Sequence, residues 1–199
     1  MDFGHLSAYD SDIKFLDVIR QFVISETRRT DTIPSAYSGG FSKLDDGRDI
    51  RTVYPHGIEE VRLLLSQTLP LNFVGFIGYK RPTEEIGQDL VDKIWQIDRE
   101  LITEMRNHSD IIAYVTGERE DGEWGNLVVL RKVDAIEKWR DSKIHATAIS
   151  EISPKYYTKI RIHRGKLLHG FHGNFNCHRT LFLDYDSGKM IHREVKEWT

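Results

Sequence analysis

The order of apolar segments between residues 72 and 168 constrains the fold of this chain more than any other feature. Four short runs rich in β-branched and aromatic residues have the length of strands and lie at residues 73–79, 111–116, 124–130 and 156–163. Two longer segments repeat their apolar residues at helical spacing, at residues 82–105 and 134–149. The predicted order is therefore strand, helix, strand, strand, helix, strand.

This order is typical of the ferredoxin-like, or split β-α-β, arrangement. We therefore expect an α+β domain in which four antiparallel strands form a sheet and both helices cover one face. The first strand is apolar on both faces, since Phe73 lies on one and Val74 and Phe76 on the other. Because the helices cover only one face, a second copy of the sheet is the simplest cover for the other. This pattern predicts a homodimer.

The residues before this unit predict a helical extension and a long connection. Apolar residues at helical spacing indicate a helix over residues 13–24, with Ser11 or Asp12 as its N-cap. Turn-forming residues are frequent over residues 27–57, which we interpret as a long loop. Residues 58–67 predict a short helix.

The residues after this unit predict a β-hairpin over residues 179–198, with its turn at 186–189. In the first predicted strand, Gly75 and Gly78 indicate close approach of another element. We divide the chain into an N-terminal helical extension with a long loop, a ferredoxin-like domain, and a C-terminal loop with a hairpin packed on that domain, at residues 1–71, 72–168 and 169–199.

Composition argues against several classes of protein. A net charge of -3 over 199 residues, with a pI near 6.3, is not typical of a protein that wraps nucleic acid. No apolar run approaches the roughly 20 residues needed to span a bilayer. The first residues lack the basic start and apolar stretch of a signal peptide. Cys177 is the only cysteine, so no internal disulfide can form. Together these features predict a cytoplasmic protein.

The second predicted helix carries the motif Trp139-x-x-Ser142, followed by small residues and a tyrosine-rich strand. With this motif and strand order, residues 72–168 resemble the dimeric α/β-barrel superfamily. That superfamily includes antibiotic-biosynthesis monooxygenases, heme-degrading monooxygenases and stress-responsive barrel proteins. The resemblance implies a homodimer whose sheets face each other as a barrel, with a ligand pocket between sheet and helices in each subunit.

Two places on this unit carry candidate chemistry. His145 lies on the flank of the helix stripe, where it could act as a base or orient a substrate. The alternative is a border histidine that bonds a backbone group. On the fourth strand, Arg161 and His163 share a face that could hold a carboxylate or phenolate. Strand alternation places Tyr157 and Lys159 on the same face. The alternative there is an edge strand with a solvated, positively charged face.

We therefore expect a small-molecule enzyme: a cofactor-free monooxygenase, cyclase or isomerase acting on an aromatic or polyketide-like substrate. The candidate catalytic residues are His145, His163 and Tyr114, with Tyr156 as a second candidate for proton transfer. The candidate substrate-binding residues are Arg161, Trp124, Trp139 and Tyr156. The alternatives are a non-catalytic protein that binds a small molecule or a partner, and a heme-binding protein.

Imidazole and thiol side chains gather near the end of the chain, at His163, His169, His172, Cys177 and His178. No pair has the spacing typical of a metal site, so we expect no metal there and interpret the segment as a loop near a pocket mouth. Heme is an alternative offered by the resemblance, with His145 or His163 as its ligand. Alignment on Trp139, however, places Ile149 where the heme-degrading members have their axial histidine.

Overall fold

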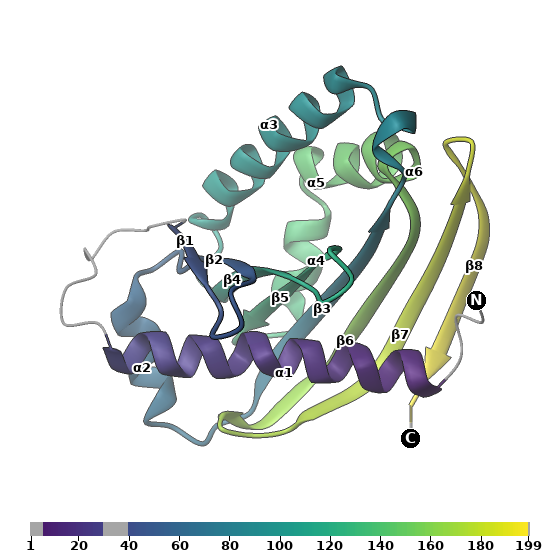
Figure 1. Ribbon diagram of the computed structural model, residues 1–199. Helices are drawn as coiled ribbons and strands as arrows, with labels where there is room; N and C mark the ends of the chain where they lie inside the picture. Colours follow the sequence, from purple (N-terminus) through teal and green to yellow (C-terminus); the bar gives the residue numbers. More distant parts are fainter. Residues whose placement is uncertain (1–5, 30–39, 199) are drawn as a thin grey trace.

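A computed structural model describes residues 6–29 and 40–198. The described residues form one eight-stranded sheet in the order β1-β2-β4-β5-β3-β6-β7-β8, and every neighbouring pair is antiparallel (Figure 1). The strands are β1 (Gly40–Lys43), β2 (Asp49–Val53), β3 (Leu71–Lys80), β4 (Ile111–Glu118), β5 (Trp124–Leu130), β6 (Tyr157–Phe171), β7 (Phe175–Asp186) and β8 (Lys189–Glu197).

Helices lie on both faces of the sheet (Figure 1). They are α1 (Leu6–Arg29), α2 (Ile58–Leu65), the 3-10 turn η1 (Thr83–Glu85), α3 (Gln88–Met105), α4 (Asp134–Arg140), α5 (Lys143–Thr147), the π-helical turn η2 (Ala148–Ile152) and α6 (Ser153–Tyr156). Within the described residues, no helix combines the length and the apolar character needed to cross a membrane.

The ferredoxin-like fold class predicted from the sequence is wrong. The four predicted strands correspond to β3, β4, β5 and β6, which are adjacent, but they are only the middle of a larger sheet. β2 and β1 continue it beyond β4, and β7 and β8 continue it beyond β6. The sequence did not reveal β1 and β2 because turn residues surround these two short strands. The predicted C-terminal hairpin exists, but it joins the sheet because β6 runs on to Phe171.

The helix predicted over residues 82–105 begins later than expected, because η1 occupies residues 83–85 and α3 starts only at Gln88. The helix predicted over residues 134–149 is divided into α4, α5, η2 and α6. Its first break is at Ser142, whose extended backbone lets its hydroxyl accept a hydrogen bond of 3.0 Å from the His145 amide. The Trp139-x-x-Ser142 motif therefore spans the end of one helix and the cap of the next.

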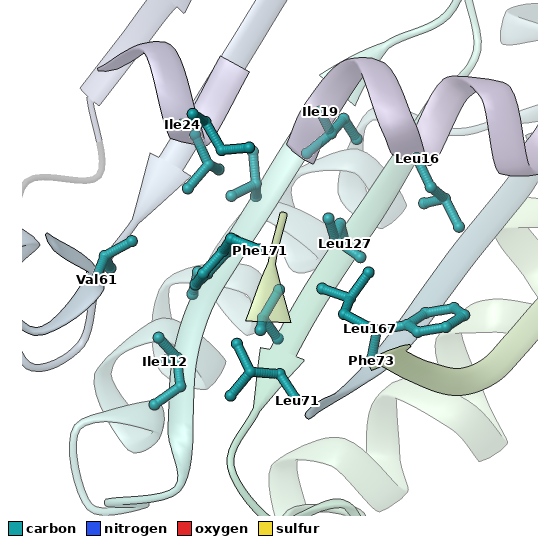
Figure 2. Close-up of a cluster of buried hydrophobic side chains, with 14 of the residues drawn as sticks. Leu16, Ile19, Ile24, Val61, Leu71, Phe73, Ile112, Leu127, Leu167 and Phe171 are labelled. Carbon is teal, nitrogen blue, oxygen red and sulfur yellow. The ribbon is translucent and has the colours of Figure 1, made fainter. Parts of the chain in front are cut away.

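The second apolar face of the sheet is covered by the chain's own helix α1, which runs across the strands (Figure 1). Leu16, Ile19 and Val23 of α1 are fully buried. Figure 2 shows Leu16 and Ile19 above sheet residues such as Leu127 and Phe73. The second apolar face of the sheet is therefore covered, as expected, but the cover is helix α1 of the same chain. The reason for predicting a facing second copy no longer applies, and a homodimer stays a prediction.

Glycines let α1 lie close to the sheet. A Cβ on Gly75 would lie 2.3 Å from a methyl carbon of Leu16, and one on Gly125 would lie 2.6 Å from the Phe15 ring. The interpretation of Gly75 as a point of close approach is confirmed. The expected N-cap is wrong, because α1 begins at Leu6 and Asp12 lies inside it, fully buried.

Candidate functional site

The candidate site is a cavity of about 360 Å³ between α3 and the face of the sheet opposite α1. The side chains that enclose it are largely aromatic, and these are Phe41, Phe76, Trp95, Tyr114, Trp124, Tyr156 and Tyr157. The size is at the lower end of the range for small-molecule sites, and an apolar lining with a few polar groups is typical of them.

Strand register forms the floor of the cavity. One row of directly paired residues crosses five strands, from β1 to β3, and consists of Phe41, Arg51, Thr116, Asn126 and Phe76. Side chains paired in this way point to the same face of an antiparallel sheet. The row therefore places an arginine and two small polar groups between two aromatic rings, all facing the cavity.

Helix α3 forms the roof. Its cavity residues are spaced by three or four positions, so that they lie on one side of the helix, and are Val91, Ile94, Trp95 and Asp98. Trp95 retains 48% of its accessible surface and Phe41 retains 58%. These two partly exposed rings mark the mouth of the cavity.

Tyr157 and Gly78 form one end of the cavity. A Cβ on Gly78 would lie 2.4 Å from the Tyr157 ring, so the glycine makes room for it. This confirms that Gly78 marks a close approach. Tyr157 was expected to share a face with Arg161, and that expectation is wrong. An irregularity in the β3–β6 pairing skips Thr158 and places Tyr157 on the cavity face.

Two polar interactions organise the cavity. The Arg51 NH2 group donates to both carboxylate oxygens of Asp98, at 3.0 and 2.8 Å, and so connects the floor to the roof. The Asn126 side-chain amide donates to the Tyr114 hydroxyl at 3.0 Å. Burial, reinforced by the nearby negative charge of Asp98, raises the pKa of Tyr114 to about 12. Tyr114 is therefore a neutral phenol at physiological pH.

Three of the residues proposed from the sequence come together in this cavity: Tyr114, Trp124 and Tyr156. Trp139 lies behind the wall instead. It packs edge-on against Tyr114, with ring centroids 6.4 Å apart, and stacks flat on His145 at 4.8 Å. Trp139 therefore supports the wall without lining the cavity.

His145 also lies outside the cavity lining. Its ring is partly buried against Trp139, and its Nδ1 is buried without a hydrogen-bond partner. Burial lowers the pKa of His145, which favours the neutral imidazole. His145 therefore does not reach the cavity as the proposed general base would. A backbone hydrogen bond at Arg140 also acts on the ring and opposes the lowering of its pKa, which agrees with the alternative of a border histidine.

Arg161 and His163 lie on the opposite face of the sheet, under α1. The guanidinium of Arg161 donates to both carboxylate oxygens of Asp12, at 2.5 and 2.7 Å. His163 Nε2 lies 2.9 Å from the same carboxylate, and its Nδ1 lies 2.8 Å from the Thr180 hydroxyl. The candidate residues His145, Arg161 and His163 share no pocket, because the sheet separates His145 from the other two.

This second cluster is closed. Asp12 and His163 are fully buried, and Arg161 retains only 5% of its accessible surface. The alternative of a solvated edge strand is therefore wrong, because β6 is an interior strand covered by α1. Arg119 adds a further contact to Asp12 at 3.3 Å. The cluster fastens α1 to the sheet.

The pKa values of the cluster show mutual stabilisation. Burial alone would raise the pKa of Asp12, but hydrogen bonds from His163 and Arg161 outweigh it and the pKa is lowered. Burial would lower the pKa of His163, but the hydrogen bonds and charges of Asp12 and Cys177 together outweigh it and the pKa is raised. Each of the two groups therefore favours the charged form of the other.

The described residues contain no group of three or more His, Cys, Asp or Glu side chains that could hold a metal. The histidine-rich segment is not a loop at the pocket mouth: it belongs to β6, β7 and their turn, where His172 bonds the Leu65 carbonyl at 2.9 Å. The residues present do not fit heme either. No histidine or cysteine lines the cavity, and His163 already bonds Asp12 and Thr180.

Sequence reasoning missed Arg51, Thr116 and Asp98. Arg51 lies in a segment interpreted as a loop, and its strand is only five residues long. Asp98 belongs to a side of α3 outside the stripe predicted to be buried. The apolar pair Val91 and Trp95 on that side was the one available signal.

Comparisons with known proteins place this chain in no family. No family model matches it, and no curated protein matches it. Among solved structures, the chain is similar to protein SO0527 from Shewanella oneidensis, with 9% sequence identity and a TM-score of 0.39. The similarity covers 50% of this chain and 91% of that one. It is too low to support an inference about fold or function.

Proposed function

We propose that the protein binds a small, planar, apolar molecule in the cavity between α3 and the sheet. The observation that carries this proposal is the lining itself, in which seven of sixteen residues are aromatic. Aromatic side chains provide large apolar contact areas and favour stacked or edge-on contacts with other rings. A flat ring system is the ligand shape that such walls recognise best.

The chemistry of the cavity favours binding over turnover. Proton transfer near neutral pH requires a group whose pKa lies close to the working pH. Burial raises the pKa of Tyr114, Tyr156 and Tyr157, so these phenols stay protonated. The histidines expected to be catalytic, His145 and His163, lie elsewhere. These features support the non-catalytic binding alternative more than a monooxygenase, cyclase or isomerase.

A titration with a neutral bicyclic hydrocarbon, 2-ethylnaphthalene, tests this proposal. We expect saturable binding by isothermal titration calorimetry and a change in tryptophan fluorescence, since Trp95 and Trp124 line the cavity. Gly78→Ala should weaken this binding about tenfold, because the new methyl displaces the Tyr157 ring into the cavity.

Gly87→Ala is the matched control. It makes the same chemical change at the start of α3, where the structure places no heavy atom within 4 Å of the new methyl. Its affinity should equal that of the unmodified protein. Absence of saturable binding, or equal affinities for Gly78→Ala and Gly87→Ala, would contradict the proposal.

A further inference from the structure

We propose that Arg140, Arg164 and Arg179 form a second binding site, which takes the phosphate group of a small aliphatic phosphate ester. The site lies on the same face of the sheet as the cavity, but none of these three residues lines the cavity. Arg164 is the central group: a partly buried guanidinium flanked by two further arginines. This site is separate from the one that carries the proposed function and does not depend on it.

Strand register brings the arginines together. Arg164 of β6 pairs directly with Arg179 of β7, so both side chains point to the same face of the sheet. Arg164 also pairs with Val74 of β3, which packs on the cluster that includes Trp139 of α4. Arg140 is the last residue of α4. Two arginines therefore lie side by side, and a third lies at the end of the neighbouring helix.

The surroundings of Arg164 are unfavourable for a cation. Its side chain is partly buried and makes no hydrogen bond or ion pair within residues 6–29 and 40–198. Burial and the positive charges of Arg179 and Arg140 lower the pKa of Arg164, and only Glu137 opposes them. An anion in contact with all three guanidiniums would replace this repulsion with attraction.

The acids near the arginines leave the guanidiniums available. Glu197 lies 3.5 Å from the Nε of Arg179, and both side chains are largely exposed. Asp141 engages only the Nε of Arg140, at 3.2 Å, and is also exposed. Glu137 is exposed as well. The formal charges balance, but exposed pairs of this kind are weak, and none of the three acids hydrogen-bonds the central guanidinium.

The chemistry of three arginines favours a phosphate group. A guanidinium donates two parallel hydrogen bonds to phosphate oxygens, and its fixed charge does not depend on pH. A phosphate monoester carries close to two negative charges near pH 7 and has three acceptor oxygens. A carboxylate has one charge and two oxygens, so it satisfies fewer of the donors.

An apolar row beside the arginines indicates what the phosphate is attached to. Ile162 lies two positions from Arg164 on β6, and Leu181 lies two positions from Arg179 on β7, so the row shares their face. Leu181 also pairs with Val195 of β8. All three apolar side chains remain partly exposed. An alkyl group can therefore lie on this row while its phosphate reaches the arginines.

Titrations with butyl phosphate and with inorganic phosphate at low ionic strength test this inference by isothermal titration calorimetry. We expect saturable binding of butyl phosphate, about tenfold tighter than that of inorganic phosphate, because its alkyl group buries apolar surface on the row. Gly78→Ala should leave butyl phosphate binding unaltered, because that glycine belongs to the aromatic cavity.

Arg164→Gln should weaken the binding of both phosphates about tenfold or more, as the loss of charge-assisted hydrogen bonds predicts. Its thermal stability should not fall, because the substitution removes a charge that its neighbours repel. Arg179→Gln should also weaken both. Arg193→Gln is the matched control: it makes the same change at an exposed position of β8 and should alter binding by less than about twofold.

Leu181→Ala tests the apolar row separately. It should weaken butyl phosphate binding about threefold and leave inorganic phosphate binding unchanged, since only the alkyl group contacts the row. Absence of saturable binding, or equal losses in Arg164→Gln and Arg193→Gln, would overturn the site. Equal affinities for the two phosphates would overturn the assignment of an ester. None of these results bears on the cavity, which the uncharged naphthalene derivative tests.

Discussion

The two faces of the sheet use polar residues in opposite ways. Under α1, Asp12 meets Arg161 and His163, and every oxygen of its buried carboxylate has a partner. On the other face, the Nε of Arg51 is buried without a hydrogen-bond partner. Fully satisfied networks stabilise a structure, whereas unsatisfied groups beside a cavity are characteristic of sites that await a ligand.

Packing follows the same division. Gly75 and Gly125 let α1 pack closely against the sheet. Gly78, by contrast, accommodates the Tyr157 ring at the end of an open cavity. Packing on the α1 face therefore stabilises the fold, and the α3 face is the part of the molecule available for binding.

The largest effect is expected from Asp12→Asn. This change removes the buried carboxylate and leaves Arg161 and His163 in the interior without their counter-charge. We expect the free energy of unfolding to fall by about 3–5 kcal/mol, measured by urea denaturation. Asp10→Asn, on the exposed side of the same helix, should change it by less than about 0.5 kcal/mol. Similar values for the two variants would contradict the assigned role of Asp12.

The packing of α1 is tested by Gly75→Ala. The added methyl would lie 2.3 Å from Leu16, which is fully buried and has no space to move into. Overpacking of this kind should lower the free energy of unfolding by about 1–3 kcal/mol. Thermal unfolding beside Gly87→Ala provides the comparison, and a stabilised Gly75→Ala variant would show that α1 packs less closely than described.

The ionised cluster should also make stability depend on pH. The folded-state pKa of His163 is raised, so its contribution is complete below 6.5, the unfolded value, and is lost as the pH rises through the folded pKa. The pKa of Asp12 is lowered, so its contribution is present above 3.8 and is lost as the pH falls through the folded pKa.

Denaturant unfolding across pH 3–9 measures this dependence. For one proton, the slope of stability against pH cannot exceed about 1.4 kcal/mol per pH unit. His163→Gln removes the titrating ring and should flatten the part of the curve above pH 6.5. A decline above pH 6.5 that is unchanged in this variant would assign it to a different group.

The smallest effect on stability is expected on the cavity face. Thr116→Val removes a hydroxyl whose hydrogen-bond neighbour is the Tyr114 hydroxyl, so the free energy of unfolding should fall by no more than about 1 kcal/mol. The same urea series as for Asp12→Asn provides the measurement. A loss of more than about 2 kcal/mol would mean that the hydroxyl contributes more to the folded protein than one such bond provides.

Local patterns predicted the middle of the fold, and long-range packing decided the rest. Residues 73–79, 111–116, 124–130 and 157–163 all lie in strands, because periodicity and turn residues act over short distances. Only Tyr156, the first residue of the fourth predicted strand, belongs to a helix, α6. The same patterns cannot say that α1 covers the second face. That depends on contacts between Leu16 or Ile19 and strands about a hundred residues away along the chain.

The candidate site could be predicted only in part for the same reason. Tyr114 and Trp124 were expected in a ligand pocket and do line the cavity, on strands whose side chains alternate regularly between the two faces. Arg161 and His163 were correctly placed on one face, but which helix covers that face is a tertiary property. Tyr157 was assigned to the wrong face because a single skipped residue reverses side-chain direction.

The central claim is that ligand binding belongs to the α3 face alone. The most direct test is a titration of isotopically labelled protein with 2-ethylnaphthalene, followed by amide chemical shifts. We predict that the shifts concentrate at Arg51, Asp98 and Thr116, and that Leu16 and His163 stay unperturbed. Shifts centred on α1 and His163, or no saturable shifts at all, would contradict the account.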